Sequence, residues 1–101
     1  MPKGYVILTE VIQDPDGMHA YGRAAGPSLT ESRAKVLVVD REPDVLEGEW
    51  PATQTVVLEF TSVEEARTWY RSDTYQAAAK IRHDAADSNV VIVSGFDADI
   101  A

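Results

Sequence analysis

The amino-acid sequence predicts an α+β fold in which four antiparallel strands form one sheet and helices cover a single face of that sheet. Four short segments are rich in β-branched and apolar residues, which is typical of strands. Helical patterns separate the first segment from the second and the third from the fourth. The 101 residues are enough for one domain with a single two-layer core.

The first strand is predicted at residues 4–12, and a helix follows it directly. Asp14 can cap this helix, and Pro15 suits the first helical position because its φ is fixed and it lacks an N–H. Pro27 is predicted to kink the helix or to end it near Gly26. One face of the helix is apolar, because residues spaced by three and four are Met18, Tyr21, Ala25 and Leu29.

The second and third strands are predicted at residues 35–40 and 55–60. Ser62 and Glu65 form a capping box at the start of the helix that follows, since each side chain can bond the backbone N–H of the other.

The sequence Arg71-Ser72-Asp73 interrupts this helix, and Asp73 is predicted to cap a second helical segment, with Gln76 three residues on. Residues 89–96 are the last predicted strand, and residues 97–100 are expected to fray. The element order is therefore β-α-β-β-α-β. Short connections and right-handed crossovers convert that order into a ferredoxin-like arrangement.

The charge and composition exclude several classes of function. A formal net charge of -8 at pH 7 repels a phosphate backbone or an anionic membrane surface at long range, so we expect neither partner. The absence of cysteine excludes disulfides, thiolate catalysis and sulfur-ligated zinc. Residues 1–20 lack the apolar segment of a signal peptide, so the cytoplasm is the expected location.

The predicted strands are apolar on both sides, although a sheet covered on one face should alternate apolar and polar residues. In the first strand, Tyr5, Ile7 and Val11 oppose Val6, Leu8 and Ile12. In the second, Val36 and Val38 are predicted to oppose Leu37 and Val39, and the last strand alternates in the same way, with Val91 and Val93 opposing Val90 and Ile92.

A monomer with such strands would leave a large apolar patch exposed. We therefore expect a homodimer, sheet against sheet; the alternative is that all four strands are buried within the chain. Trp50 is expected to lie over the rim of the sheet or across to the partner, with Glu47 and Glu49 in water.

Several motifs resemble the family called domain of unknown function 1330. They are Glu47-Gly48-Glu49-Trp50, Glu59-Phe60 and the run Trp69-Tyr70-x-Ser72-x-x-Tyr75-Gln76, together with residues 3–7 and 89–96. The resemblance covers nearly the whole chain. It implies the dimeric α+β barrel superfamily, whose relatives include cofactor-free monooxygenases, muconolactone-type isomerases and binding proteins, and it implies no particular activity. The chain departs from the pattern at residues 30–35, where members usually carry a Gly-Gly turn.

Glu10 and Glu59 are the leading candidates for a functional carboxylate, because each is set among aliphatic residues in a strand. If buried, either would have a raised pKa and could act as a general base. The alternative is that each points to solvent at a strand edge or pairs with an arginine such as Arg82.

His83 and Asp87 are four residues apart in the predicted second helical segment, so the carboxylate could orient the imidazole as a base. The alternative is a surface contact near the helix C-terminus. His19 lies beside the apolar stripe and is expected to be solvated. The two histidines lack metal-ligand spacing, so no metal site is expected.

Tyr70 and Tyr75 flank the predicted helix break, where N–H groups near Ser72 and Asp73 could hold an anion. The alternative is purely structural, with Ser72 and Asp73 capping a helix and the tyrosines in the core. The sequence has no nucleotide-binding or serine-hydrolase motif.

We therefore expect a protein that binds a small, partly apolar molecule between sheet and helices, without a cofactor. Its expected ligand-binding residues are Tyr5, Trp50, Tyr70, Ser72, Tyr75 and Arg82. One alternative is a cofactor-independent enzyme with Glu10, Glu59 or His83 as the base and Tyr5 or Tyr75 as a proton donor. Another is a structural protein that uses the dimer only for assembly.

Overall fold

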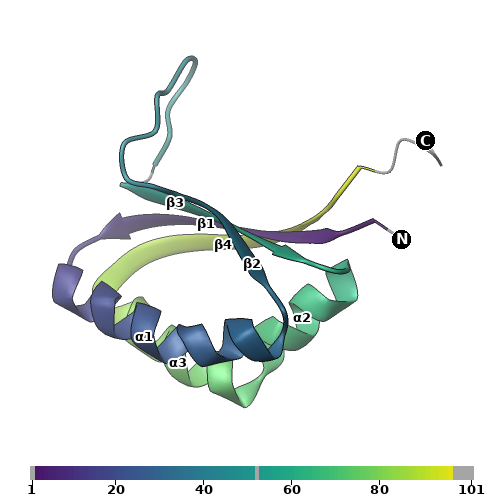
Figure 1. Cartoon of the computed structure of the whole chain (residues 1–101). Coiled ribbons are helices and arrows are strands. Elements are labelled where there is room, and N and C mark those ends of the chain that lie inside the picture. Colours follow the sequence, from purple (N-terminus) through teal and green to yellow (C-terminus); the bar gives the residue numbers. More distant parts are fainter. Residues whose placement is uncertain (1, 52, 97–101) are drawn as a thin grey trace.

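Four antiparallel strands and three helices make up the computed structural model, which describes residues 2–51 and 53–96. The helices lie on one face of the sheet (Figure 1), as the sequence predicts. In chain order the elements are β1 (Gly4–Ile12), α1 (Pro15–Glu31), β2 (Lys35–Asp40), β3 (Gln54–Phe60), α2 (Val63–Arg71), α3 (Asp73–Ala85) and β4 (Ala86–Ser94). The predicted frayed tail at residues 97–100 lies outside the described residues.

The strand order across the sheet is β2-β3-β1-β4, and all three pairings are antiparallel. This is the order of a ferredoxin-like sheet, with β1 and β3 in the centre and β2 and β4 at the edges. The fourth strand begins at Ala86, earlier than predicted, because the polar residues that open it still pair with β1 as far as Ile12. It ends at Ser94 rather than at residue 96.

The helix boundaries confirm two predicted caps. The Asp14 carboxylate accepts a hydrogen bond from the Gly17 N–H at 3.1 Å, and the Ser62 hydroxyl accepts one from the Glu65 N–H at 3.1 Å. The predicted cap of α3 is wrong, because Ser72 rather than Asp73 has the extended backbone and accepts from the Tyr75 N–H at 3.2 Å.

The helix α1 does not end near Gly26; it continues through Pro27 to Glu31. A proline inside a helix removes one backbone donor, which weakens the helix locally. Here Ala25 and Ser28 are buried on either side of the proline, and the Ser28 hydroxyl donates to the Ala25 carbonyl at 2.6 Å. Packing of this buried face explains why the helix continues.

The exit from α1 forms without the glycine pair that the family usually carries. Arg33 takes a φ of 56°, in the left-handed region that glycine adopts most easily. The next residue, Ala34, donates its N–H to the Leu29 carbonyl at 3.0 Å. A helix-ending turn of this kind satisfies a carbonyl of the last helical turn. The chain then enters β2 directly at Lys35, without a glycine in the turn.

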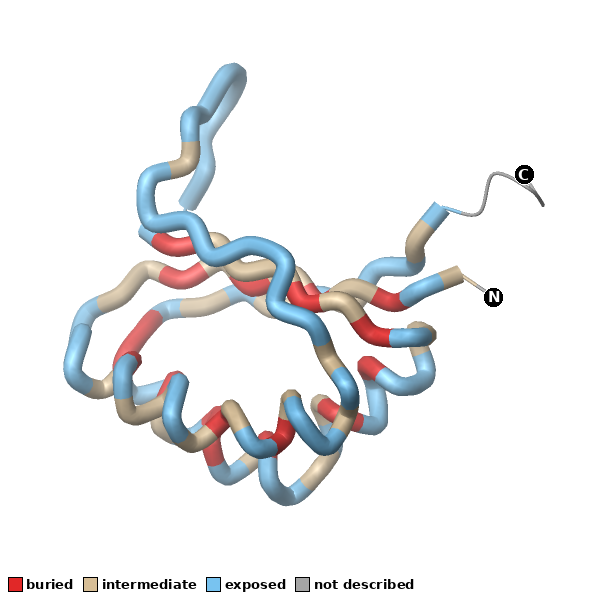
Figure 2. The backbone as a smooth tube through the Cα atoms, viewed as in Figure 1, coloured by how far each residue is buried: buried red, intermediate tan, exposed pale blue. Residues whose placement is uncertain are grey.

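The core lies between the sheet and the helices (Figure 2). Its largest members are Phe60 from β3, Trp69 from α2 and Tyr75 from α3, and the Trp69 and Tyr75 ring centroids are 4.0 Å apart. The buried Trp69 Nε1 donates to the Ser28 hydroxyl at 3.0 Å, which ties α2 to α1.

The alternation of β1 is as predicted: Val6 and Leu8 are buried toward the helices, and Tyr5 and Ile7 face the other way. The predicted alternation of β2 is wrong, because a register shift lies between Val36 and Val38. This bulge places one extra residue in the strand. As a result Val36 and Val39 share a face, opposite Leu58 and Val56 respectively.

The face of the sheet away from the helices, here called the outer face, carries exposed apolar side chains. Val38 is 40% exposed, Val91 50% and Val93 39%. Residues 41–51 project from the sheet on this same side (Figure 1), and Leu46, which belongs to this segment, is 86% exposed. Within the described residues no helix is long and apolar enough to cross a membrane.

Candidate functional site

A cavity of about 170 Å³ lies between α1 and the sheet. Its walls are mostly apolar, from Met18 and Ala25 on α1 and from aliphatic residues of β1, β2 and β3. Its polar groups come from Glu10, Tyr21, Gln54 and Trp69. Apolar walls with a few converging polar groups are typical of small-molecule sites. We call this space the α1–sheet cavity.

Glu10 is the acidic group of this cavity and is only 1% exposed. It faces the helices because it follows Val6 and Leu8 in the alternation of β1. Its Oε1 accepts a hydrogen bond from Gln54 Nε2 at 2.9 Å, and its Oε2 has no hydrogen-bond partner among the described residues. Burial raises the pKa of Glu10, and the Gln54 hydrogen bond and the charge of Arg82 offset this only in part.

Gln54 is hydrogen-bonded to Glu10 and also to Arg41, which does not line the cavity. It stands directly opposite Glu10 in the pairing of β1 with β3, and its Oε1 accepts from Arg41 Nε at 3.1 Å. On the other side, Glu10 is opposite Ser88 of β4. A row of polar residues therefore crosses the helix-facing side of three strands, which is unusual in a core and costs free energy wherever a polar atom lacks a partner.

Tyr21 supplies a hydroxyl to the cavity from α1. Its hydroxyl and that of Tyr75 are 2.9 Å apart and share a hydrogen bond. Burial, together with the neighbouring Tyr75, raises the pKa of Tyr21 well above its ordinary value, so the phenol keeps its proton. It can therefore donate a hydrogen bond to a ligand but cannot serve as a base.

Arg82 lies behind this group and is 3% exposed. Its guanidinium carbon is 5.8 Å from the centroid of the Tyr21 ring. Burial lowers the pKa of Arg82, but its interactions with Tyr75, Tyr21 and Glu10 outweigh burial and leave that pKa raised. Arg82 thus stays charged inside the protein and influences both Glu10 and Tyr21.

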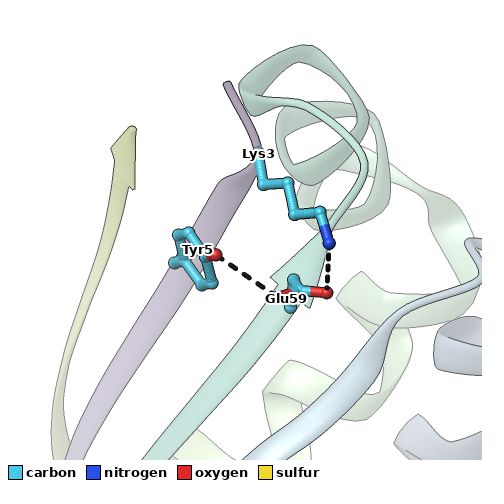
Figure 3. Close-up of polar contacts among 3 residues, drawn as sticks. All are labelled: Lys3, Tyr5 and Glu59. Carbon is cyan, nitrogen blue, oxygen red and sulfur yellow. Dashed lines mark hydrogen bonds and ion pairs between the residues drawn. The ribbon is translucent and has the colours of Figure 1, made fainter. Parts of the chain in front are cut away.

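Glu59 occupies the outer face rather than the cavity. In β3 it alternates with Leu58 and Phe60, which face the helices, and it stands opposite Tyr5 of β1. Figure 3 shows its carboxylate between Lys3 Nζ and the Tyr5 hydroxyl, each at 3.3 Å. The partner of Glu59 is thus a lysine rather than Arg82, and Tyr5 lies with it, away from the cavity.

The predicted His83–Asp87 pair on one helix is wrong. The helix α3 ends at Ala85, so His83 is in its last turn and Asp87 is already in β4. The Asp87 carboxylate accepts from Gln13 Nε2 at 2.9 Å, which anchors it to the end of β1. His19 is exposed, as predicted. The described residues hold no group of acids and histidines arranged for a metal ion.

The cluster at the helix break is mainly structural. The Ser72 hydroxyl caps α3 and also donates to the Trp69 carbonyl at 2.7 Å, and Tyr75 is fully buried in the core. Tyr70 and His83 line a separate cleft beside α3. Trp50 donates from Nε1 to the Thr55 hydroxyl at 2.8 Å, so its ring is held at the rim of the sheet where β3 begins.

Of the expected site residues, only Glu10 lines the α1–sheet cavity. Sequence reasoning missed Tyr21, Gln54 and Trp69 as members of this site. Tyr21 belongs to the apolar stripe of α1, and Gln54 precedes the predicted third strand. The register of β1 with β3 was the signal that could have found Gln54, because it sets this amide directly opposite Glu10.

The family model named Domain of unknown function (DUF1330) matches residues 3–96. The chain belongs to this family. None of the curated proteins compared with the chain matches it.

Solved structures similar to this DUF1330 chain share its fold. One, a protein of unknown function from Rhodopseudomonas palustris, is 22% identical, with 95% of this chain and 84% of that chain covered and a TM-score of 0.74. SnoaB, a cofactor-independent oxygenase from Streptomyces nogalater, is 10% identical, with 96% of each chain covered and a TM-score of 0.67.

A third similar structure, from Bacteroides fragilis, is described as a dimeric protein of unknown function with a ferredoxin-like fold. It is 14% identical, with 92% of this chain and 94% of that chain covered and a TM-score of 0.55. At these identities the likeness concerns the fold alone. Together the structures confirm the ferredoxin-like α+β fold of this DUF1330 protein.

The raised pKa of Glu10 predicts how stability depends on pH. The folded protein holds the Glu10 proton more tightly than the unfolded chain, so the contribution of Glu10 to stability falls as pH rises above its ordinary pKa of 4.5. Glu10→Gln keeps an acceptor for Gln54 without the charge. Above that pH we expect the free energy of unfolding of the variant to exceed that of the wild type, by about 1 kcal/mol or more at pH 7. The difference should vanish in acid.

Urea unfolding followed from about pH 4 to about pH 8 measures this difference. Glu31→Gln, at the exposed C-terminal end of α1, controls for the loss of one carboxylate. A difference between Glu10→Gln and the wild type that stays constant over this range would contradict a buried, proton-retaining Glu10.

Proposed function

We propose that this protein binds a small, partly apolar molecule that carries one hydroxyl or carbonyl group, in the α1–sheet cavity. The observation that carries the proposal is the buried Oε2 of Glu10, which has no hydrogen-bond partner among the described residues and belongs to a residue that lines a mostly apolar cavity. A buried polar atom without a partner costs about 1–3 kcal/mol. A ligand that bonds to this oxygen recovers that free energy on binding.

The size of the cavity supports a ligand of about one ring. An apolar cavity of about 150 Å³ holds a benzene molecule in another protein, and the α1–sheet cavity measures about 170 Å³. The chemistry of the polar groups supports a ligand with a hydroxyl or carbonyl. Burial favours the protonated form of Glu10, which can donate or accept a hydrogen bond, and the Tyr21 phenol can donate a second one.

We expect 4-fluorophenol to bind the wild-type protein about fivefold more tightly than fluorobenzene, because one added hydrogen bond is worth about 1 kcal/mol. Ligand-observed ¹⁹F NMR titration measures both affinities. Glu10→Leu should remove the preference for the phenol and leave fluorobenzene binding within about threefold.

Val39→Trp tests whether the cavity is the binding place. Val39 lines the cavity but is 57% exposed, so a larger ring can enter the cavity without crowding the core. This variant should weaken both fluorinated ligands, whereas Thr30→Trp, exposed on α1, should weaken neither. Equal binding to the wild type and Val39→Trp would place the ligands elsewhere.

Native mass spectrometry of protein purified from its own cells is a separate measurement that can reveal a retained physiological ligand.

A second candidate function is cofactor-independent catalysis by proton abstraction. The observation that favours it is the raised pKa of Glu10, because a carboxylate with a raised pKa is a stronger base. Tyr21 would donate a hydrogen bond to the oxygen on which charge develops, in the place that sequence reasoning gave to Tyr5 or Tyr75. SnoaB, a similar structure, is described as a cofactor-independent oxygenase.

Cyclohexanone, a one-ring ketone with weakly acidic α C–H bonds, tests this candidate. We expect the wild type to exchange these hydrogens for deuterium in D₂O at least about tenfold faster than Glu10→Gln, as measured by ¹H NMR. The rate should rise with pH above 4.5, since the base must be ionised. Exchange no faster than with Glu10→Gln would leave binding alone as the function.

We also propose that two copies associate through their outer faces. The support comes from exposed Val38, Val91 and Val93 and from the projecting arm, residues 41–51, on the same side of the sheet. The similar Bacteroides fragilis structure is described as dimeric.

The absence of cysteine supports the cytoplasm as the location. The charge of -8 disfavours nucleic acid as a partner.

Val91→Lys should break this association, because it places a charge in the centre of an apolar interface. Multi-angle light scattering should give the mass of two chains for the wild type and of one chain for the variant. Ala77→Lys, on the exposed side of α3, adds the same charge outside the interface and should keep the mass of two chains. A dimeric Val91→Lys protein would place the interface elsewhere.

A further inference from the structure

A second hollow, distinct from the α1–sheet cavity, lies where α3 runs directly into β4. It has a volume of about 390 Å³ and is lined by Tyr70, Arg82, His83, Ala86, Asp87, Ser88 and Val90. We call it the α3–β4 cleft. None of these seven residues lines the α1–sheet cavity. The two hollows therefore offer different chemistry.

Arg82 is the main polar residue of the cleft, and it is incompletely paired. It is 3% exposed, and its Nε is buried without a hydrogen-bond partner among the described residues. The described ion pairs are Lys3–Glu59 and Arg67–Glu64, so Glu10 influences Arg82 without forming an ion pair with it. A buried charge without a full partner is costly, and an anion at its free donor would offset that cost.

A second free donor lies in the same cleft. The Ser88 hydroxyl is buried and has no partner among the residues that the structure describes. Ser88 belongs to β4 and stands directly opposite Glu10, with its side chain on the helix side of the sheet. His83, in the last turn of α3, adds an imidazole at the edge of the cleft. One guanidinium N–H and one hydroxyl suit the two oxygens of a carboxylate.

The other walls narrow the class of anion. The Tyr70 ring, Ala86 and Val90 are apolar and suit a small aromatic or aliphatic body. Asp87 also lines the cleft and repels negative charge, so it disfavours a dianion more strongly than a monoanion. The chain as a whole is strongly acidic, so long-range attraction does not favour anions, and local donors have to bind them.

We propose that the α3–β4 cleft binds the carboxylate of a small organic monoanion, with Arg82 Nε and Ser88 Oγ as its hydrogen-bond donors. The body of the ligand packs against Tyr70 and Val90. This site is independent of the function proposed for the α1–sheet cavity. Either site can be absent without the other.

Benzoate is a suitable probe, with inorganic phosphate as the dianionic comparison. In ¹H–¹⁵N NMR titrations we expect benzoate to shift amide signals of α3 and β4, near residues 82–90, and phosphate to bind at least about tenfold more weakly. Arg82→Gln should weaken benzoate by at least about tenfold, because it removes a charge-assisted hydrogen bond. Arg23→Gln, exposed on α1, removes the same charge and should leave the affinity unchanged.

Ser88→Ala keeps Arg82 and the core and should weaken benzoate about threefold to tenfold, by loss of one neutral hydrogen bond. If Arg82→Gln fails to fold, Ser88→Ala still tests whether benzoate binds in the α3–β4 cleft. The proposal is overturned if benzoate causes no shifts in α3 and β4, if phosphate binds as tightly, or if Arg82→Gln or Ser88→Ala binds like the wild type. Shifts caused by 4-fluorophenol should instead fall in α1 and β2, so failure at one site is distinguishable from failure at the other.

Discussion

The central strand β1 pairs with β3 on one side and with β4 on the other, so its alternation decides which way the facing residues of both neighbours point. Val6, Leu8 and Glu10 all turn toward the helices. The first two are covered by the aromatic core, which is the main source of stability in a domain of this size. Glu10 places a carboxylate in the same layer because the alternation of β1 sets it on the same face as Val6 and Leu8.

That constraint creates a buried polar group between two hollows. Glu10 is held by Gln54 on β3, stands opposite Ser88 on β4 and interacts electrostatically with Arg82 on α3. Such groups are costly unless each polar atom finds a partner. Three buried atoms, Glu10 Oε2, Arg82 Nε and Ser88 Oγ, have none among the described residues. Glu10 lines the α1–sheet cavity, and Arg82 and Ser88 line the α3–β4 cleft, so each hollow has an incompletely paired polar residue in its wall.

The outer face follows from the same alternation, because every residue that turns from the helices is left to water or to a second copy. In β1 and β4 these residues include Ile7 and Val91, which stand opposite each other. Glu59, Tyr5 and Lys3 form a polar contact at one end of this face (Figure 3). The chemistry proposed for the protein therefore lies on the helix side of the sheet and its association on the other.

The sequence by itself determined the element order, the alternation of β1, the capping of α1 and α2 and the family, because these depend on residues close together in the chain. It also indicated Glu10 as a carboxylate among aliphatic residues. It did not determine that Glu59 lies on the outer face, that β2 contains a bulge, or that α3 ends at Ala85. Only the tertiary structure decided these points and brought Gln54, Ser88, Tyr21 and Arg82 around Glu10, because strand register and helix packing join residues as far apart as positions 10 and 88.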